Sequence, residues 1–140
     1  MTSAAPFGMG DSSFQAAGGT VGLERLSRRF YEHMATLPEA AGIRSMHPAD
    51  LSLSAAKLAA FLSGWLGGPK AYLARFGPIS IPAVHEHLKI DEAERDAWML
   101  CMARATRDQP WSEAFKAYFM EAIAHPAERV RVTSVARRAR

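Results

Sequence analysis

Cysteine is almost missing from this sequence, because Cys101 is the only one among 140 residues. One cysteine cannot form an internal disulfide, and it cannot supply the several thiolates of a cysteine-based zinc site. Cys101 lies in an apolar stretch with helical spacing, so we expect it to be a small buried residue. The sequence therefore indicates no redox role for this thiol.

Long apolar runs are missing as well. No stretch of about 18 apolar residues is present, so the sequence offers no candidate for a helix that crosses a bilayer. The first 19 residues have neither the basic start nor the apolar segment of a secretory signal, and we expect residues 1–17 to be a flexible lead-in. These features predict a cytoplasmic protein without a membrane partner.

The formal charge of +3 originates at one end of the sequence. Residues 126–140 contain five arginines against one acid, which is +4 and leaves −1 for the other 125 residues. The basic residues therefore form a tail and not a face that could follow a phosphate backbone. We expect this tail to be disordered, and we expect no nucleic-acid partner.

Strand signals are scarce, because no alternating apolar run is followed by a hairpin turn. Apolar residues recur instead at steps of three and four, as on one face of a helix. The pattern predicts one all-α domain over residues 18–125. We expect its main helices over residues 21–36 and 52–66, from Asp91 onward, and from about Trp111 to a stop at Pro126.

An irregular segment, residues 67–90, separates the second and third helices. Its three glycines and three prolines exclude a long helix, and a small domain rarely keeps so long a connection without a function. It contains His85 and His87, which a helical turn would point about 200° apart, so they cannot share a metal ion. A single inward histidine could instead be one axial ligand of a haem.

Five stretches of the sequence carry a pattern that is rarely found together: Gly18-Gly19, "RRFYEHM" (28–34), "MHPADL" (46–51), "FLSGWLGGPKAYLARFG" (61–77) and "AERDAWMLCM" (93–102). In this order they resemble the motifs of the group II truncated haemoglobins, and the resemblance spans residues 14–124. It implies a two-over-two sandwich of antiparallel helix pairs around a haem b. It also implies that His85, eight residues after Gly77, is the ligand of the haem iron.

The resemblance also implies which residues line the two sides of the haem. On the distal side Tyr31, His47 and Trp98 would donate hydrogen bonds to a diatomic ligand, beside Ser54 and Leu58. Leu58, Phe61 and Trp98 would contact the haem. Three donors aimed at a ligand with partial negative charge would slow its release. Each donor could instead have a purely structural role. Tyr31 could be a half-buried aromatic residue, His47 a residue of the loop, and Trp98 part of the core packing.

Two positions depart from the family pattern. Relatives usually have basic residues just before the proximal histidine, where this sequence has Pro82-Ala83-Val84, so the haem propionates need other partners. The sequence also departs from the family pattern just after the proximal histidine, at Glu86-His87-Leu88-Lys89. His87 is therefore an alternative candidate for the iron ligand. His47 stands where many relatives have tyrosine or phenylalanine, so we expect a pH-dependent distal pocket. The candidates for the propionates are Lys70, Tyr72 and Arg75, with Arg44 and Lys57 as alternatives.

The resemblance implies a haem protein that binds O2 and other diatomic ligands. A donor-rich pocket favours ligand sensing or redox detoxification of nitric oxide or peroxide over bulk oxygen transport. Peroxidase or nitric oxide dioxygenase activity would need a separate reductase, because the sequence has no flavin or nicotinamide motif. The alternative is a haem-free or weakly haem-binding interaction module with a basic tail. A homodimer is left open.

Overall fold

The structure, a computed structural model, describes residues 6–80, 85 and 87–139, and all of its regular elements are helices. The predicted all-α class is therefore confirmed. Within these residues no helix is both long and apolar enough to cross a membrane. The elements are α1 (Ser12–Ala16), α2 (Gly19–Thr36), the short 3-10 helix η1 (Pro38–Ala40), α3 (Ala41–Arg44), α4 (Ser52–Trp65), α5 (Ala71–Phe76), α7 (Glu92–Arg107) and α8 (Glu113–Arg138).

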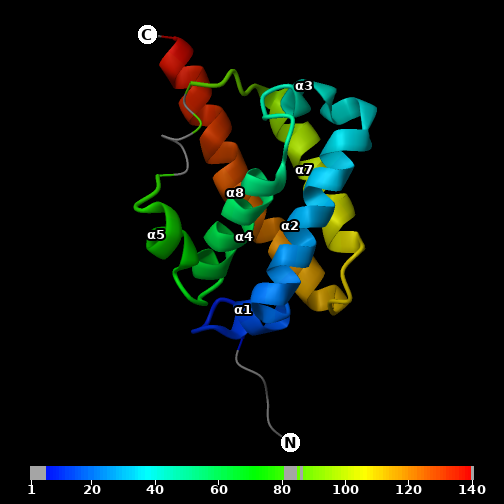
Figure 1. Cartoon of the computed structure of the whole chain (residues 1–140), viewed down its shortest axis with the longest axis vertical. Coiled ribbons are helices and arrows are strands. Elements are labelled where there is room, and N and C mark those ends of the chain that lie inside the picture. The colour runs from blue at the N-terminus through cyan, green and yellow to red at the C-terminus, as the bar shows by residue number, and fades with distance from the viewer. Residues whose placement is uncertain (1–5, 81–84, 86, 140) are drawn as a thin grey trace, which may run out of the picture.

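Four long helices form two pairs. Helix α2 packs against α4, α7 packs against α8, and α2 also packs against α7, which joins the two pairs. Figure 1 shows that the members of each pair run in opposite directions. This is the two-over-two sandwich that the resemblance implied. The short helix α5 follows α4 and lies at the edge of the molecule (Figure 1).

The core lies where the four long helices meet, and each helix contributes to it. Trp111 precedes α8 and packs edge-on against Phe115 and Phe119, with ring centroids 5.0 and 5.4 Å away. Cys101 is fully buried, as predicted, and burial raises the pKa of its thiol to about 11. Other fully buried side chains include Leu23, Leu26, Phe30, Met34, Leu62, Met102 and Ile123.

A polar contact also holds α2 against the end of α7. His33 Nε2 lies 2.7 Å from an oxygen of Asp108, and Arg29 donates to the same oxygen at 2.8 Å. These contacts, that of His33 first, lower the pKa of Asp108 to about 2. Asp108 is thus ionised at neutral pH.

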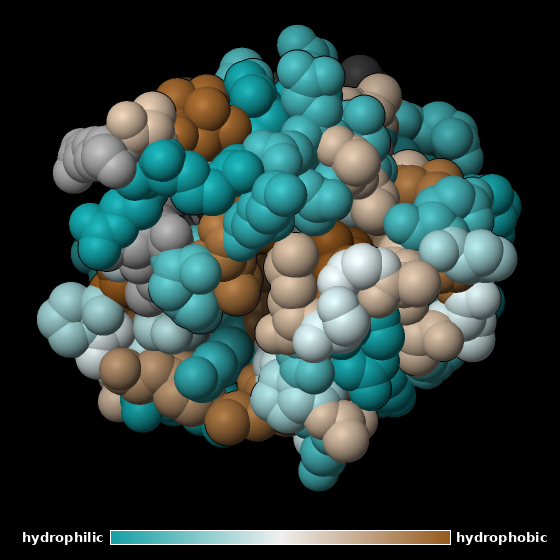
Figure 2. Space-filling view, turned by 90° about the horizontal axis from the view of Figure 1, so that it is seen from above, coloured by the Kyte–Doolittle hydropathy of each residue, from teal (hydrophilic) through white to brown (hydrophobic). Residues whose placement is uncertain are grey.

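Most of the surface seen in Figure 2 is hydrophilic, with apolar side chains visible in a hollow near its centre.

The prediction that residues 1–17 form a flexible lead-in is wrong for the second half of this segment, which the structure describes. Phe14 is buried, and its backbone N–H donates to the carbonyl of Leu66 at 3.1 Å. The indole of Trp111 donates to the carbonyl of Ala17 at 3.0 Å. These partners lie about 50 and 90 residues away in the chain, so local composition did not reveal them.

The expected end of the last helix at Pro126 is also wrong, because α8 continues to Arg138. The residues expected to form a disordered tail are therefore helical from 126 to 138. A proline removes one helix hydrogen bond, and beyond Pro126 the helix makes polar contacts both with α7 and within itself. Glu128 accepts hydrogen bonds from Arg95 of α7 and from Arg131, at 2.8 and 2.6 Å.

Gly22 permits the close contact between α2 and the end of α1. A Cβ at this position would lie 1.9 Å from the carbonyl oxygen of Ala17, so Gly22→Ala should lower the free energy of unfolding by roughly 1–3 kcal/mol. Gly42→Ala is the control, because a Cβ there meets nothing within 4 Å; it should be neutral or raise stability by up to about 1 kcal/mol. Urea denaturation of both variants checks this, and equal midpoints would contradict it.

Candidate functional site

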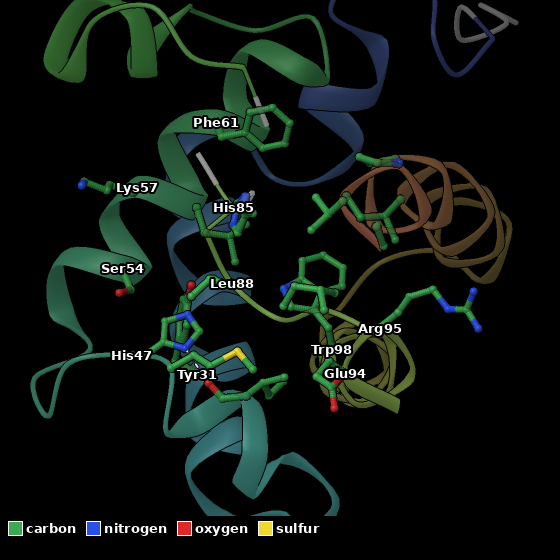
Figure 3. A pocket seen from close by; sticks show the side chains of 18 of the residues that line it. Tyr31, His47, Ser54, Lys57, Phe61, His85, Leu88, Glu94, Arg95 and Trp98 are labelled. Carbon is green, nitrogen blue, oxygen red and sulfur yellow. Dashed lines mark hydrogen bonds between the residues drawn. The ribbon is translucent and has the colours of Figure 1, made fainter. Parts of the chain in front are cut away.

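A cavity of about 310 Å³ lies between the helix pairs. This volume is in the range of pockets for small molecules and cofactors, and most of the lining side chains are apolar. Figure 3 shows side chains of α4 on one side of it and side chains of α7 facing them. Eight of the residues predicted for the site line this cavity: Tyr31, His47, Ser54, Leu58, Phe61, Tyr72, His85 and Trp98.

Tyr31 and Trp98 both pack against one buried ring, and His47 packs against Tyr31. Phe30 is fully buried in α2, and its ring centroid lies 4.9 Å from that of Tyr31 and 5.1 Å from that of Trp98. The Tyr31 ring packs edge-on against the imidazole of His47 at 5.6 Å. Tyr31 and His47 thus share one end of the cavity, and His85 lies apart from them (Figure 3).

The phenol of Tyr31 keeps its proton, and so its capacity to donate a hydrogen bond, over a wide pH range. Burial raises its pKa from 10.0 to about 12, because a buried tyrosinate would lose its hydration. Tyr31 therefore keeps its O–H across neutral and mildly alkaline pH. The phenol can donate to a ligand or accept from one, but at these pH values it does not carry a charge.

The imidazole of His47 has its tautomer set by the backbone. Nδ1 lies 2.8 Å from the carbonyl oxygen of Ile43, which can only accept, so Nδ1 carries the hydrogen. In the neutral ring, Nε2 is then an acceptor. This differs from the donor role expected for His47, because Nε2 gains an N–H only when the ring is protonated.

The two histidines of the irregular segment differ in their surroundings. His85 is half-buried and lines the cavity, whereas His87 is exposed and does not line it. The neighbouring departures from the family pattern at Pro82-Ala83-Val84 and Glu86 lie outside the described residues. Among the described residues no three His, Cys, Asp or Glu side chains converge as a metal site. One imidazole beside an apolar cavity is, however, the protein contribution that axial haem ligation requires.

The candidates for the haem propionates fall into two groups. Tyr72 and Lys57 line the cavity, and the ammonium of Lys57 points outward in Figure 3. Lys70 does not line the cavity, and neither does Arg75, which borders a smaller cavity of about 160 Å³ between α2, α4 and α5. Arg44 does not line it either; its guanidinium donates to the carbonyls of residues 48 and 49 at 3.0 Å and so supports the loop before α4.

Comparison with known proteins identifies the fold. The family model of the bacterial-like globins matches residues 12–132. The Group 2 truncated hemoglobin YjbI of Bacillus subtilis (strain 168) is 35% identical over 96 residues, which is 66% of this chain and 70% of the relative. This chain belongs to the group II truncated haemoglobins.

Solved structures of truncated haemoglobins share the same architecture. The group II 2-on-2 haemoglobin of Agrobacterium tumefaciens is 37% identical, with a TM-score of 0.82 over 94% of this chain and 98% of that one. A truncated haemoglobin of Bacillus subtilis is 27% identical, with a TM-score of 0.77 over 84% of this chain and 97% of that one. The family resemblance that the motifs indicated is therefore confirmed.

Part of the cavity wall of this truncated haemoglobin was missed by the sequence analysis. Glu94 and Arg95 of α7 line the cavity, and so do Pro126, Ala127 and Val130 of α8. The α8 residues were missed because the helix was expected to end at Pro126. The spacing of Glu128 and Arg131, three residues apart, was the available signal that the helix continues.

The raised pKa of Tyr31 can be tested by alkaline titration. This truncated haemoglobin has three tyrosines, and the phase that belongs to Tyr31 should appear only near pH 12. The folded pKa lies above the unfolded one, so the contribution of Tyr31 to stability is complete below about pH 10 and falls as the pH rises from 10 towards 12. Near-ultraviolet tyrosinate absorption should lose this late phase in Tyr31→Phe. A variant that loses amplitude near pH 10 and keeps the late phase would show that Tyr31 ionises normally.

Proposed function

We propose that this truncated haemoglobin holds haem b in the cavity between its helix pairs, with His85 as the axial ligand of the iron. The proposal rests on the placement of His85 in the same apolar cavity as Tyr31, His47 and Trp98, but apart from the first two. Haem supplies the iron centre that takes up O2 and other diatomic ligands. The residues present fit that group, because a half-buried imidazole faces a cavity walled by apolar side chains such as Leu58, Phe61 and Ile123.

The distal residues determine how firmly a ligand is kept. Tyr31 offers an O–H and Trp98 an indole N–H in a cavity with a mostly apolar lining, where a hydrogen bond to partial negative charge is stronger than in solution. His47 adds a donor only in its protonated form. Together these groups slow ligand release. The solved relative from Bacillus subtilis is an oxygen-avid truncated haemoglobin, which supports the same behaviour here.

Slow release favours ligand sensing or redox detoxification over bulk oxygen transport. Turnover of nitric oxide or peroxide would consume electrons, so a nitric oxide dioxygenase or peroxidase role requires a separate reductase. A cytoplasmic location follows from the sequence features and stays a prediction. A homodimer likewise stays open.

The mouth of the cavity can accommodate the acidic edge of the haem. Lys57 is the basic side chain of α4 at the cavity, and its outward direction suits a carboxylate that reaches the solvent. Tyr72 of α5 adds a hydroxyl on the cavity lining. Arg95, on the α7 side, is already paired with Glu128 and Asp96 at 2.8 and 3.0 Å. We therefore assign the propionates to Lys57 and Tyr72 in preference to Lys70 and Arg75.

Two histidine variants test the haem assignment. His85→Ala should remove most of the Soret absorbance of purified protein reconstituted with haemin, because the axial bond is lost. His87→Ala should leave the spectrum nearly unchanged, since His87 is exposed and outside the cavity. The reverse pattern would show that His87 is the ligand. Wild-type protein that takes up no haemin at all would favour the haem-free interaction module.

A tryptophan variant tests the distal donors. Trp98→Phe keeps an aromatic ring but deletes the N–H, so O2 should dissociate roughly tenfold to a hundredfold faster, the equivalent of about 1.5–3 kcal/mol for a hydrogen bond to a charged group. Carbon monoxide, which accumulates less charge, should change less. Trp65→Phe is the matched control, because Trp65 packs on Phe61 without lining the cavity. Stopped-flow off-rates equal to those of Trp65→Phe would reduce Trp98 to a packing role.

A further inference from the structure

The part of α8 beyond Pro126 contacts the segment that links His85 to α7. We name this segment, residues 87–91, the proximal connection. Ser134 of α8 is fully buried. Its hydroxyl donates to the carbonyl of Leu88 at 2.7 Å and accepts from the N–H of Ile90 at 2.8 Å. One side chain thus pairs two backbone groups of the proximal connection.

The contact of Ser134 lies close to His85 along the hydrogen-bonded backbone. The N–H of Leu88 donates to the carbonyl of His85 at 3.0 Å, so one further bond leads from the residue held by Ser134 to the histidine itself. The side chains of Leu88 and Ile90 line the cavity together with the imidazole of His85. Any shift of the proximal connection would therefore move His85 and the cavity wall together.

A second contact joins the same two elements one turn later. Arg138 forms an ion pair with Asp91 and donates to the carbonyl of Ile90 at 3.5 Å. Asp91 is also the N-cap of α7, in a capping box with Glu94 whose side chain accepts from the Asp91 N–H at 2.8 Å. Both ion-pair side chains are substantially exposed, so solvent screens their attraction. The buried hydroxyl of Ser134 is the stronger constraint, because its loss would leave two backbone groups unpaired.

We propose that Ser134 is a positioning residue for the proximal histidine. By fixing Leu88 and Ile90 it restricts how far the imidazole of His85 can move relative to the cavity, and it thereby governs haem retention and the axial bond. This role rests on the proposed function of His85. It assigns to the basic end of the chain a function at the haem site, through a residue 49 positions after the histidine that it positions.

Ser134→Ala tests this role in the full chain. Removal of the hydroxyl leaves the Ile90 N–H and the Leu88 carbonyl without their partner, so the Ile90 amide should exchange its hydrogen roughly tenfold faster. Haem should transfer to excess apomyoglobin several-fold faster than from the wild type. In the reduced protein, the iron–histidine stretching band should shift or broaden, which a change in overall stability alone would not cause.

Ser63→Ala is the matched control. Ser63 is also a buried helical serine, and its hydroxyl donates to the carbonyl of Pro69 at 2.7 Å, away from the proximal connection. It should lower the urea midpoint to a similar extent, while haem transfer and the iron–histidine band stay as in the wild type. If Ser134→Ala gives the same haem transfer and the same band as Ser63→Ala, the positioning role is overturned.

The failure of this inference can be told apart from the failure of the proposed function. If His85→Ala retains haem as the wild type does, the assignment of His85 is wrong whatever Ser134 does. The Ile90 amide can also be followed in the haem-free protein, where its exchange reports on the proximal connection alone. An exchange rate unchanged by Ser134→Ala would show that the hydroxyl does not hold this segment, and it would overturn the role on its own.

Discussion

The structure depends on the packing of one apolar face of α2 against both α4 and α7. Leu23, Leu26, Phe30 and Met34 form that face and are essentially fully buried. Each such side chain contributes about 1.5–3 kcal/mol when it leaves water, before the conformational entropy cost of folding is subtracted. Because α2 packs against both α4 and α7, it determines the separation between the two helix pairs and hence the width of the cavity.

The same packing prepares the distal end of the cavity. Phe30 faces the core, while its neighbour Tyr31 faces the cavity, and the Phe30 ring contacts both Tyr31 and Trp98. The two donors therefore come from different helices but are oriented by one buried ring. In the proposed haem complex their geometry would not need to form when a ligand arrives, which is the condition under which hydrogen-bond donors stabilise charge most effectively. His47 is restrained separately, by the hydrogen bond from its Nδ1 to the Ile43 carbonyl.

The sequence predicted the long helices well, because their signals are local. The expected range 21–36 compares with Gly19–Thr36, and 52–66 compares with Ser52–Trp65, since apolar stripes and end signals lie within each helix. Local signals failed at both ends of the domain. Phe14 and Ser134 are buried by partners far away in the chain, and those contacts outweigh the composition of their surroundings.

The candidate site was predictable to a similar extent and for a similar reason. The family resemblance led to eight residues that line the cavity, and five of them lie within the quoted motifs. The directions of Lys70 and Arg75 could not be read, since α5 is a short helix after a glycine-rich turn and its rotation depends on packing. Val130 was missed because the last helix was expected to end at Pro126. Arg95 was missed because its place at the cavity depends on how α7 crosses its neighbours, which a single sequence does not encode in any local pattern.

The contact between Ser134 and the proximal connection also orders events during synthesis. A ribosome adds roughly 5–20 residues each second, so residue 134 follows residue 85 by about 2–10 s. During that interval the nascent chain presents its histidine on a segment that no later helix restrains. If Ser134 positions His85 as proposed, cofactor captured so early would be released readily, and durable loading would wait until α8 has been translated and has closed over the segment.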